Sequence, residues 1–297
     1  MSEFALEACG LGKRYGKTWA LRDCTLNVSA GSVTALVGPN GAGKTTLLHL
    51  AVGLTNPTTG SVRVLGSSAR MEPALVLPRV GFVAQDHPLY ARFRVSEMLK
   101  AGQKLNRSWD DALARARLER LRLRLEQKVG TLSGGQQAQL ALTLALAKRP
   151  ELLLLDEPVA ALDPLARREF LQSLMEAVAD GGLTVVLSSH IVTDLERVCD
   201  DVILLSRAEV QLAGPIDEIV AQHRVLTGPR SDPSAVERVH SIIQASHTER
   251  QTTLLVRANG HLYDSRWQVA EVGLEEVVLA YLRREQAQTQ KYEEVAS

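Results

Sequence analysis

The sequence predicts an α/β fold with a largely parallel sheet, a helical insertion and a small C-terminal appendage. Short apolar runs such as ELLLLDEP and LTVVLSSH have the length of buried strands, and amphipathic stretches of helical length separate them. Strands that alternate with helices are typical of βαβ units, whose strands lie parallel in one sheet. A mostly helical stretch at about 88–149 interrupts this alternation and predicts an inserted helical subdomain.

The first elements are strands joined by turns. Strands are expected over FALEACGLGKRYG and ALRDCTLNVSAG, and the buried strand SVTALVG leads into the helix GKTTLLHLAVGL. Next come a hairpin or edge strand in TTGSVRVLG, a strand in RVGFVAQ and an amphipathic helix in DDALARARLERLRLRLE. The last elements of this part are ELLLLDEP, a helix in PLARREFLQSLMEAVADGG, LTVVLSSH, a helix in IVTDLERVC and a strand pair in DDVILLSRAEVQLAG.

A change of composition near HRVLTGPRSDPSA predicts a linker, because Gly, Pro and Ser gather there. We therefore expect a main domain over 1–222 and a small accessory region of helices and strands over 223–297.

Composition restricts the class of protein. The 297 residues are 45% hydrophobic, which is sufficient for a sizeable core. Lys plus Arg equals Asp plus Glu at 34 each, so no nucleic-acid partner is expected. The three cysteines, Cys9, Cys24 and Cys199, lack CxxC spacing and are expected to be reduced thiols. We expect no signal peptide and no membrane span, so that any link to a membrane runs through a partner.

The segment GPNGAGKT fits the phosphate-loop pattern G-x-x-x-x-G-K-[ST] between a buried strand and a helix. Glycines allow backbone N–H groups to curl around phosphate oxygens, and the helix N-terminus adds a positive field. Lys44 is expected to bridge the terminal phosphates of the nucleotide, and the Thr45 hydroxyl is suited to Mg²⁺. The expected nucleotide-binding residues are Gly38, Pro39, Asn40, Gly41, Ala42, Gly43, Lys44, Thr45 and Thr46. The alternative is a glycine-rich turn with a chance lysine.

Acidic and imidazole groups follow two buried strands. Asp156 and Glu157 end ELLLLDEP, and His190 ends LTVVLSSH. In open α/β sheets, ligands bind at the carboxyl ends of the strands. Asp156 is then placed to reach the Mg²⁺ shell, Glu157 to polarise an attacking water, and His190 to contact the γ-phosphate. A plain helix N-cap is the alternative for the two acids, and a structural histidine is the alternative for His190.

Two further residues carry weaker signals. Gln85 follows a predicted strand, and its amide oxygen can ligate Mg²⁺ or orient water. Tyr15 in KRYGK is either a turn tyrosine or a ring that stacks on adenine.

LSGGQQ contains no acid, no base and no good metal ligand, yet it leads directly into a helical stretch. It therefore predicts a second phosphate-binding turn, made by Ser133, Gly134, Gly135 and Gln136, with its helix beginning near Gln136.

Taken together, these motifs resemble the ATP-binding-cassette (ABC) ATPases over about residues 4–222. The resemblance rests on KRYG, GPNGAGKTT, Gln85, LSGGQ, LLLLDEP, ALDP and SSH in that order. It implies a P-loop NTPase core with a mainly parallel sheet, an antiparallel β subdomain and a helical signature subdomain, and it implies ATP and Mg²⁺ as cofactors. The implied roles are adenine stacking for Tyr15, coupling to the membrane partner for Gln85, the signature for Ser133 to Gln136, catalysis for Glu157, an inter-subunit loop for Asp163 and a switch for His190.

The resemblance also implies partners. Two cassettes pack head to tail, so that each ATP lies between one phosphate loop and the signature of the other subunit, and they drive a transmembrane permease subunit. Gln137 and Gln139 stand where the family often has basic residues, and Ala160 replaces the usual Ser or Asn before ALDP. These departures concern the dimer interface rather than ATP hydrolysis.

The tail VGLEEVVLAYLRRE resembles the ending of cassette subunits of bacterial ABC-2-type exporters. The expected function is therefore ATP hydrolysis for an exporter at the cytoplasmic face of the membrane, with drug or antibiotic efflux as the guess for its substrate. An importer ATPase, and a soluble cassette ATPase acting on ribosomes or nucleic acid, are the alternatives. Importers of sugar type have a larger C-terminal domain, and soluble cassettes have two phosphate loops or a long coiled-coil insertion.

Overall fold

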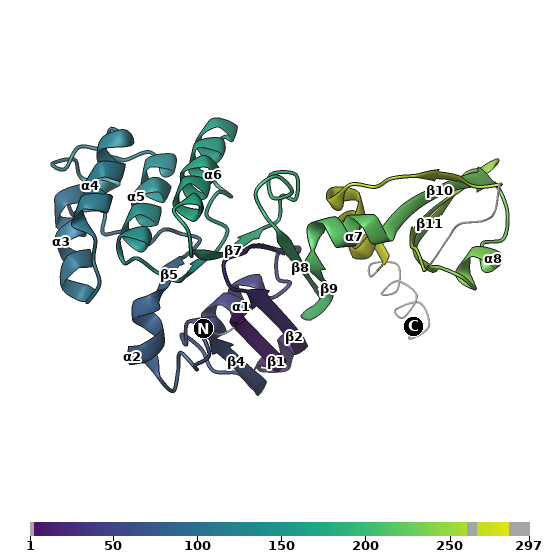
Figure 1. Ribbon diagram of the computed structural model, residues 1–297, viewed down its shortest axis with the longest axis horizontal. Helices are drawn as coiled ribbons and strands as arrows, with labels where there is room; N and C mark the ends of the chain where they lie inside the picture. Colours follow the sequence, from purple (N-terminus) through teal and green to yellow (C-terminus); the bar gives the residue numbers. More distant parts are fainter. Residues whose placement is uncertain (1–2, 260–265, 285–297) are drawn as a thin grey trace. The chain divides into compact units, whose positions relative to one another are not determined.

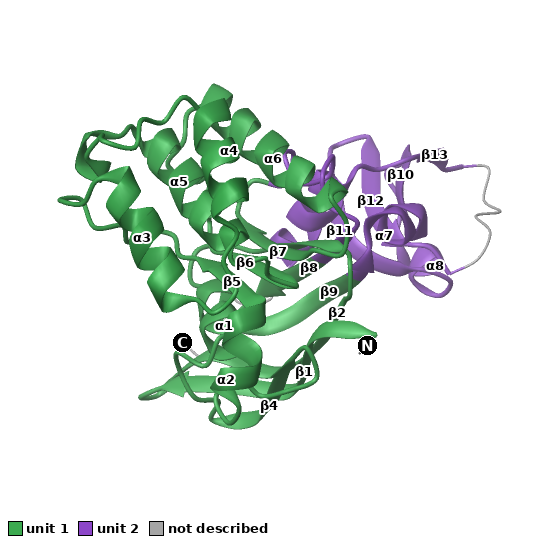
Figure 2. Cartoon of the chain, turned by 60° about the vertical axis from the view of Figure 1, so that its left-hand side comes forward, with its two compact units in different colours: residues 1–191, 203–213 green, residues 192–202, 214–297 purple. Residues whose placement is uncertain are grey.

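The computed structural model describes residues 3–259 and 266–284, which form two compact units (Figure 2). Unit 1 comprises Met1–Ile191 and Ile203–Ala213, and unit 2 comprises Val192–Val202 and Gly214–Ser297. The sequence placed the boundary after residue 222, whereas the units divide the chain before α7 (Ile216–Gln222).

A six-stranded sheet forms the centre of unit 1, and its parallel part positions the functional residues. Its order is β5 (Val80–Val83), β6 (Leu152–Leu155), β7 (Thr184–Ser189), β3 (Val33–Val37), β8 (Asp201–Ser206) and β9 (Glu209–Pro215). The pairs β5–β6, β6–β7 and β7–β3 are parallel. Every residue of β3, β6 and β7 is buried, as expected for parallel strands covered on both faces.

A separate antiparallel sheet has the order β2 (Thr18–Ser29), β1 (Phe4–Tyr15) and β4 (Thr59–Val64). The segment TTGSVRVLG is thus an edge strand. One core joins this sheet to α1 (Lys44–Ala51) and to the parallel sheet, through side chains such as Leu11, Leu48 and Leu154.

The helical subdomain contains α3 (Val95–Leu105), α4 (Asp111–Arg120) and α5 (Gly134–Ala147), with α6 (Pro164–Ala179) beside α5 (Figure 1). It has a core of its own, which includes Leu99, Leu118 and Leu140. The remaining short helices of unit 1 are α2 (Pro73–Val76), η1 (Leu77–Arg79) and η2 (Val129–Thr131).

Two expected helices differ from the structure. The stretch DDALARARLERLRLRLE is helical only to Arg120, because Arg122 adopts φ +55°, which ends a right-handed helix. The segment IVTDLERVC forms turns rather than a helix. Some of its backbone N–H groups donate to the carbonyl three residues earlier, as Leu195 does to Val192, and others to the carbonyl four residues earlier, as Cys199 does to Leu195. These bonds do not form the continuous i to i−4 series of an α-helix.

Unit 2 is built on an antiparallel sheet of order β11 (Ser241–His247), β12 (Gln251–Arg257), β10 (His223–Pro229) and β13 (Gln268–Ala270). The helices α7 and α8 (Ser234–Glu237) and the helical residues 274–284 accompany it. The expected linker was wrong in its first half, because HRVLTGP is β10, an inner strand paired on both sides.

Buried His223 joins three segments of unit 2. Its Nδ1 lies 2.6 Å from the Ile219 carbonyl oxygen, and its Nε2 lies 3.1 Å from the Tyr281 hydroxyl. A carbonyl only accepts, so Nδ1 carries the proton and Nε2 accepts from Tyr281. Burial lowers the pKa of His223 below its ordinary value.

This depressed pKa predicts that acid weakens unit 2. Below about pH 6.5 the unfolded histidine binds a proton that the folded one excludes, so the free energy of unfolding falls as the pH falls. Above that pH, His223 contributes no pH dependence. Urea unfolding at several pH values, followed by the fluorescence of Trp267 in a Trp19→Phe, Trp109→Phe background, measures the effect. His223→Gln should flatten this dependence, whereas His247→Gln, at an exposed position of β11, should leave it unchanged.

Candidate functional site

The phosphate loop, residues 38–46, comprises the turn that follows β3 and the first turn of α1, at the carboxyl edge of the parallel sheet. A Cβ on Gly38 would lie 2.2 Å from the Leu205 carbonyl oxygen, and one on Gly43, at φ +107°, would lie 2.4 Å from that of Ala20. Only glycine fits at both positions. No acidic residue occupies the first turn of α1, so the positive end of the helix is available to an anion.

Lys44 is buried, and its ammonium group makes three contacts. Its Nζ donates to the carbonyl oxygens of Gly38 at 2.7 Å and Pro39 at 3.3 Å. It also lies 3.1 Å from Glu157 Oε1, and the two side chains are only 6% and 7% exposed. The lysine that is expected to hold phosphate is thus paired with the expected catalytic carboxylate.

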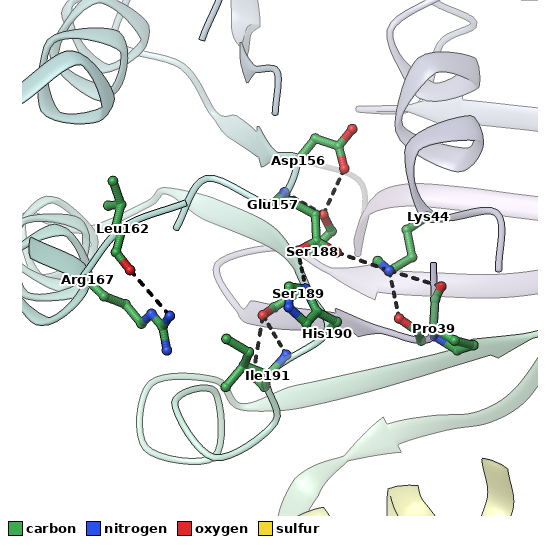
Figure 3. A network of polar contacts seen from close by, with 11 residues as sticks. Pro39, Lys44, Asp156, Glu157, Leu162, Arg167, Ser188, Ser189, His190 and Ile191 are labelled. Atoms are coloured by element: carbon green, nitrogen blue, oxygen red, sulfur yellow. Dashed lines mark hydrogen bonds and ion pairs between the residues drawn. The ribbon is translucent and has the colours of Figure 1, made fainter. Parts of the chain in front are cut away.

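Asp156 and Glu157 directly follow β6, as the sequence predicted. Glu157 has φ +46°, a left-handed conformation that costs roughly 1–3 kcal/mol for a residue with a side chain. Such strain persists where the surrounding contacts fix it, and it is frequent at active sites. This backbone conformation brings the Glu157 carboxylate between Lys44 and His190 (Figure 3).

His190 contacts the second oxygen of the same carboxylate. Its Nδ1 lies 2.7 Å from Glu157 Oε2, and its ring is 44% exposed, unlike the buried glutamate. The structure therefore joins Lys44, Glu157 and His190 into one chain of contacts that ends at the surface. The sequence placed all three at this edge of the sheet but did not predict that they touch.

Asp156 is 1% exposed, and its Oδ1 accepts a hydrogen bond from the Ser188 hydroxyl at 2.9 Å. The same hydroxyl accepts from the Glu157 backbone N–H at 2.8 Å. The motif SSH contains Ser188, but the sequence alone predicts no role for it. A polar residue at the end of an apolar buried strand, one strand away from Asp156, was the signal available.

Three further predicted residues, Thr45, Gln85 and Tyr15, are exposed, whereas Ala42 of the phosphate loop is buried. Thr45 lies in the first turn of α1, Gln85 follows β5, and Tyr15 is 52% exposed at the end of β1. Lys13 Nζ lies 4.9 Å from the centre of the Tyr15 ring. Gln85 makes no hydrogen bond to Lys44, Asp156 or Glu157 within the described residues. Its roles in ligating Mg²⁺ and in coupling stay predictions.

The signature residues form the N-terminus of α5. Ser133 and Gln136 make a reciprocal capping box, in which Ser133 Oγ accepts from the Gln136 N–H at 3.2 Å and Gln136 Oε1 accepts from the Ser133 N–H at 3.0 Å. The helix begins at Gly134 rather than near Gln136, because Ser133 caps it. Ser133 and Gly134 are exposed.

Asp163 caps the neighbouring helix α6, accepting from the N–H groups of Leu165 and Ala166 at 3.0 Å each. A Cβ on Gly135 would lie 3.0 Å from the Ala166 Cβ, so the two helix N-termini lie side by side. The signature residues and Asp163 therefore lie together at the surface. Among the described residues, none of them makes a hydrogen bond or ion pair with Lys44, Glu157 or His190.

The described residues contain no cluster of three or more His, Cys, Asp and Glu side chains that would hold a metal ion unaided. Asp156 Oδ2 is free of hydrogen bonds within this part of the chain, and Thr45 is an exposed residue. These two oxygen ligands suit Mg²⁺, which usually takes its remaining ligands from water and substrate phosphates. The residues therefore fit a Mg²⁺ ion bound together with a nucleotide.

Comparison with known proteins shows the family to which the chain belongs. The ABC transporter family profile matches residues 21–160. The chain is 35% identical over 210 residues to the Nod factor export ATP-binding protein I of Rhizobium leguminosarum bv. viciae, covering 69% of this chain and 67% of the relative. It is 33% identical over 237 residues to the phosphonates import ATP-binding protein PhnC of Maricaulis maris, covering 72% and 89%. It is 38% identical over 230 residues to the sulfate/thiosulfate import ATP-binding protein CysA of Xanthomonas campestris, covering 74% and 65%.

Solved structures share the fold. The ATP-binding subunit of an ABC transporter superposes with a TM-score of 0.66 at 29% identity, covering 73% of this chain and 92% of that one. A bacterial ABC transporter cassette solved as a dimer gives 0.63 at 27% identity, covering 71% and 98%. The predicted P-loop NTPase fold is thereby confirmed. The chain belongs to the ATP-binding subunits of ABC transporters and is an ATPase.

Proposed function

We propose that the chain is the ATPase subunit of an exporter, bound to a separate permease at the cytoplasmic face of the membrane. The observation that carries its attachment to a membrane partner is an apolar groove of about 700 Å³ in unit 1. Within the described residues, no helix has the length and apolar character needed to cross a bilayer.

The groove lies between the parallel sheet and the helical subdomain, beside Gln85. Ala84 and His87 line it on either side of that glutamine, and Leu54, Tyr90 and Leu105 line it while being more than half exposed. Exposed apolar patches of this kind are typical of protein interaction sites. A permease segment in this groove would cover these side chains and lie next to Gln85. The position of Gln85 between two lining residues supports its proposed coupling role.

The site supports hydrolysis by an activated water. Mg²⁺, when bound, neutralises the phosphate charge and orients the terminal phosphate. Glu157 accepts a proton from the attacking water while the oxygen of that water bonds to the γ-phosphorus. The bond from the γ-phosphorus to the bridging oxygen breaks, and ADP leaves with that oxygen. Lys44 balances negative charge on the phosphates, and His190 holds the Glu157 carboxylate in place.

We further propose that the exposed N-terminus of α5 binds the ATP of a second cassette. Ser133→Arg should abolish the ATP-dependent dimer, because the long arginine side chain would fill the space in which the γ-phosphate would dock. ATP binding by the monomer should be unchanged. Size-exclusion chromatography with ATP, in a Glu157→Gln background that preserves the nucleotide, tests this.

Ser133→Asn is the matched control, because asparagine also caps helices and so retains the start of α5. If the arginine variant dimerises with ATP as the Glu157→Gln parent does, the proposed sandwich is wrong.

Export is supported by the Nod factor export relative and by the resemblance of the tail, whose residues 274–284 are helical. The sulfate/thiosulfate and phosphonates import relatives favour an importer as the second candidate. The test is to co-express the chain with membrane proteins encoded beside it. Failure to co-purify with any of them would contradict the transporter proposal.

Inverted membrane vesicles then determine the direction, because the cytoplasmic side of the membrane faces outward. With radiolabelled antibiotics as probes, an exporter accumulates label when ATP is added. ATP-driven loss of label from loaded vesicles would instead identify an importer.

A further inference from the structure

Ser188 lies at the centre of the catalytic edge, although its hydroxyl faces neither Lys44 nor His190. It is fully buried near the end of β7. Its Oγ donates to Asp156 Oδ1 at 2.9 Å and accepts from the Glu157 backbone N–H at 2.8 Å (Figure 3). One hydroxyl thus holds both acidic residues that follow β6.

The sheet register explains this placement. β6 and β7 pair in parallel, with Leu155 opposite Leu187, so the next residue on β7 adjoins the first acidic residue after β6. The three β7 residues before Ser188 are apolar, namely Val185, Val186 and Leu187, and the hydroxyl of Ser189 after it accepts from the Ile191 N–H at 3.0 Å. A buried hydroxyl in such a strand requires hydrogen-bond partners. The Ser188 hydroxyl donates to Asp156 and accepts from Glu157.

Each hydrogen bond fixes a different property of the site. The bond to Oδ1 fixes the orientation of the Asp156 carboxylate and leaves Oδ2 without a hydrogen-bond partner among the residues that the structure describes. The bond from the N–H holds the left-handed Glu157 backbone, at φ +46°, and this conformation directs the Glu157 side chain toward Lys44 and His190. Loss of the hydroxyl would therefore release the metal-facing carboxylate and the strained turn together.

We propose that Ser188 is a positioning residue for ATP hydrolysis, which couples the orientation of Asp156 to the backbone conformation of Glu157. This inference rests on the proposed roles of Asp156 and Glu157. Ser188 touches neither nucleotide nor water in this scheme and acts through its two partners. Its removal should affect metal-dependent binding and turnover, while the phosphate loop continues to bind nucleotide.

The test compares Ser188→Ala with the wild-type chain. We expect kcat to fall about tenfold to hundredfold, the usual effect of removing a group that orients a ligand of a metal, with KM for ATP little changed. Calorimetry of ADP binding provides a readout besides activity. The affinity in EDTA should stay the same, whereas the gain in affinity on adding Mg²⁺ should shrink. Ser188→Thr retains the hydroxyl and should restore much of both properties.

Thr184→Val is the matched control, because Thr184 is a buried hydroxyl residue at the opposite end of β7 whose Oγ1 accepts from the Gly31 N–H at 2.8 Å. It should lower thermal stability without affecting kcat or the increase in ADP affinity on adding Mg²⁺. If the alanine variant does not fold, Ser188→Cys provides the same comparison, since a thiol is a much weaker hydrogen-bonding group of similar shape.

The inference would be overturned if Ser188→Ala retained the wild-type kcat and the wild-type increase in ADP affinity on adding Mg²⁺. It would also be overturned if Thr184→Val lost as much of both quantities as Ser188→Ala. Undiminished turnover by Asp156→Asn and Glu157→Gln would be a different failure. It would remove the proposed roles of those residues themselves, and the inference about Ser188 with them.

Discussion

Glu157→Gln is expected to bind ATP and to lose nearly all turnover. General-base catalysis contributes about 100-fold to 10,000-fold to a rate, and an amide at this position cannot accept the proton of the attacking water. Nucleotide affinity should be retained or increased, because the carboxylate that competes with phosphate for Lys44 is neutralised. Phosphate release under steady-state conditions and calorimetry with ADP measure the two effects.

The control for this substitution is Glu151→Gln. Glu151 lies just before β6, at the opposite end of the strand from Glu157, and forms an ion pair with Arg79 at 2.5 Å. That pair is about half exposed and so contributes little stability. Turnover should remain near wild type. Substantial hydrolysis by Glu157→Gln would remove Glu157 from the role of general base.

Lys44→Ala is expected to impair both nucleotide binding and stability. The variant lacks the ammonium group that balances phosphate charge, so ATP and ADP affinities should fall by at least about tenfold. It also leaves the buried Glu157 carboxylate without its cation, and removing one partner of a buried ion pair costs about 3–5 kcal/mol in the free energy of unfolding. Calorimetry and urea unfolding measure these losses.

The double variant Lys44→Ala, Glu157→Gln separates the two effects. Without the lone carboxylate, much of the lost stability should return, whereas nucleotide affinity should stay low. Lys148→Ala is a control for loss of a different lysine, which is partly buried and donates to the Leu77 and Val80 carbonyl oxygens away from the phosphate loop. Unchanged nucleotide affinity in Lys44→Ala would contradict the phosphate-loop assignment.

The positions of the candidate-site residues in the fold were predictable where they depend on local sequence. The phosphate loop needs glycines, a lysine and a helix N-terminus within one short segment, so its pattern is visible without a structure. Asp156, Glu157 and His190 were predictable because each directly follows an apolar run of strand length, and the ends of parallel strands meet at one edge.

Errors in the predicted fold occurred where tertiary contacts override local composition. HRVLTGP contains glycine and proline and suggested a linker, yet it is an inner strand because β12 and β13 pair with it on both sides. IVTDLERVC has a helical pattern but forms turns. Local propensity is a weak prior that packing and pairing routinely overcome.

The sequence by itself determined the family, the parallel sheet and the order of the motifs, because each of these depends on the spacing of residues along the chain. Only the tertiary structure decided which side chains touch. The contacts in question are the ion pair of Lys44 with Glu157, the contact of His190 with the same carboxylate and the bridging position of Ser188. They join α1 to the residues directly after β6 and to residues at or directly after the end of β7. The physical reason is that these contacts depend on sheet register and on the left-handed backbone of Glu157, and long-range pairing rather than local sequence fixes both.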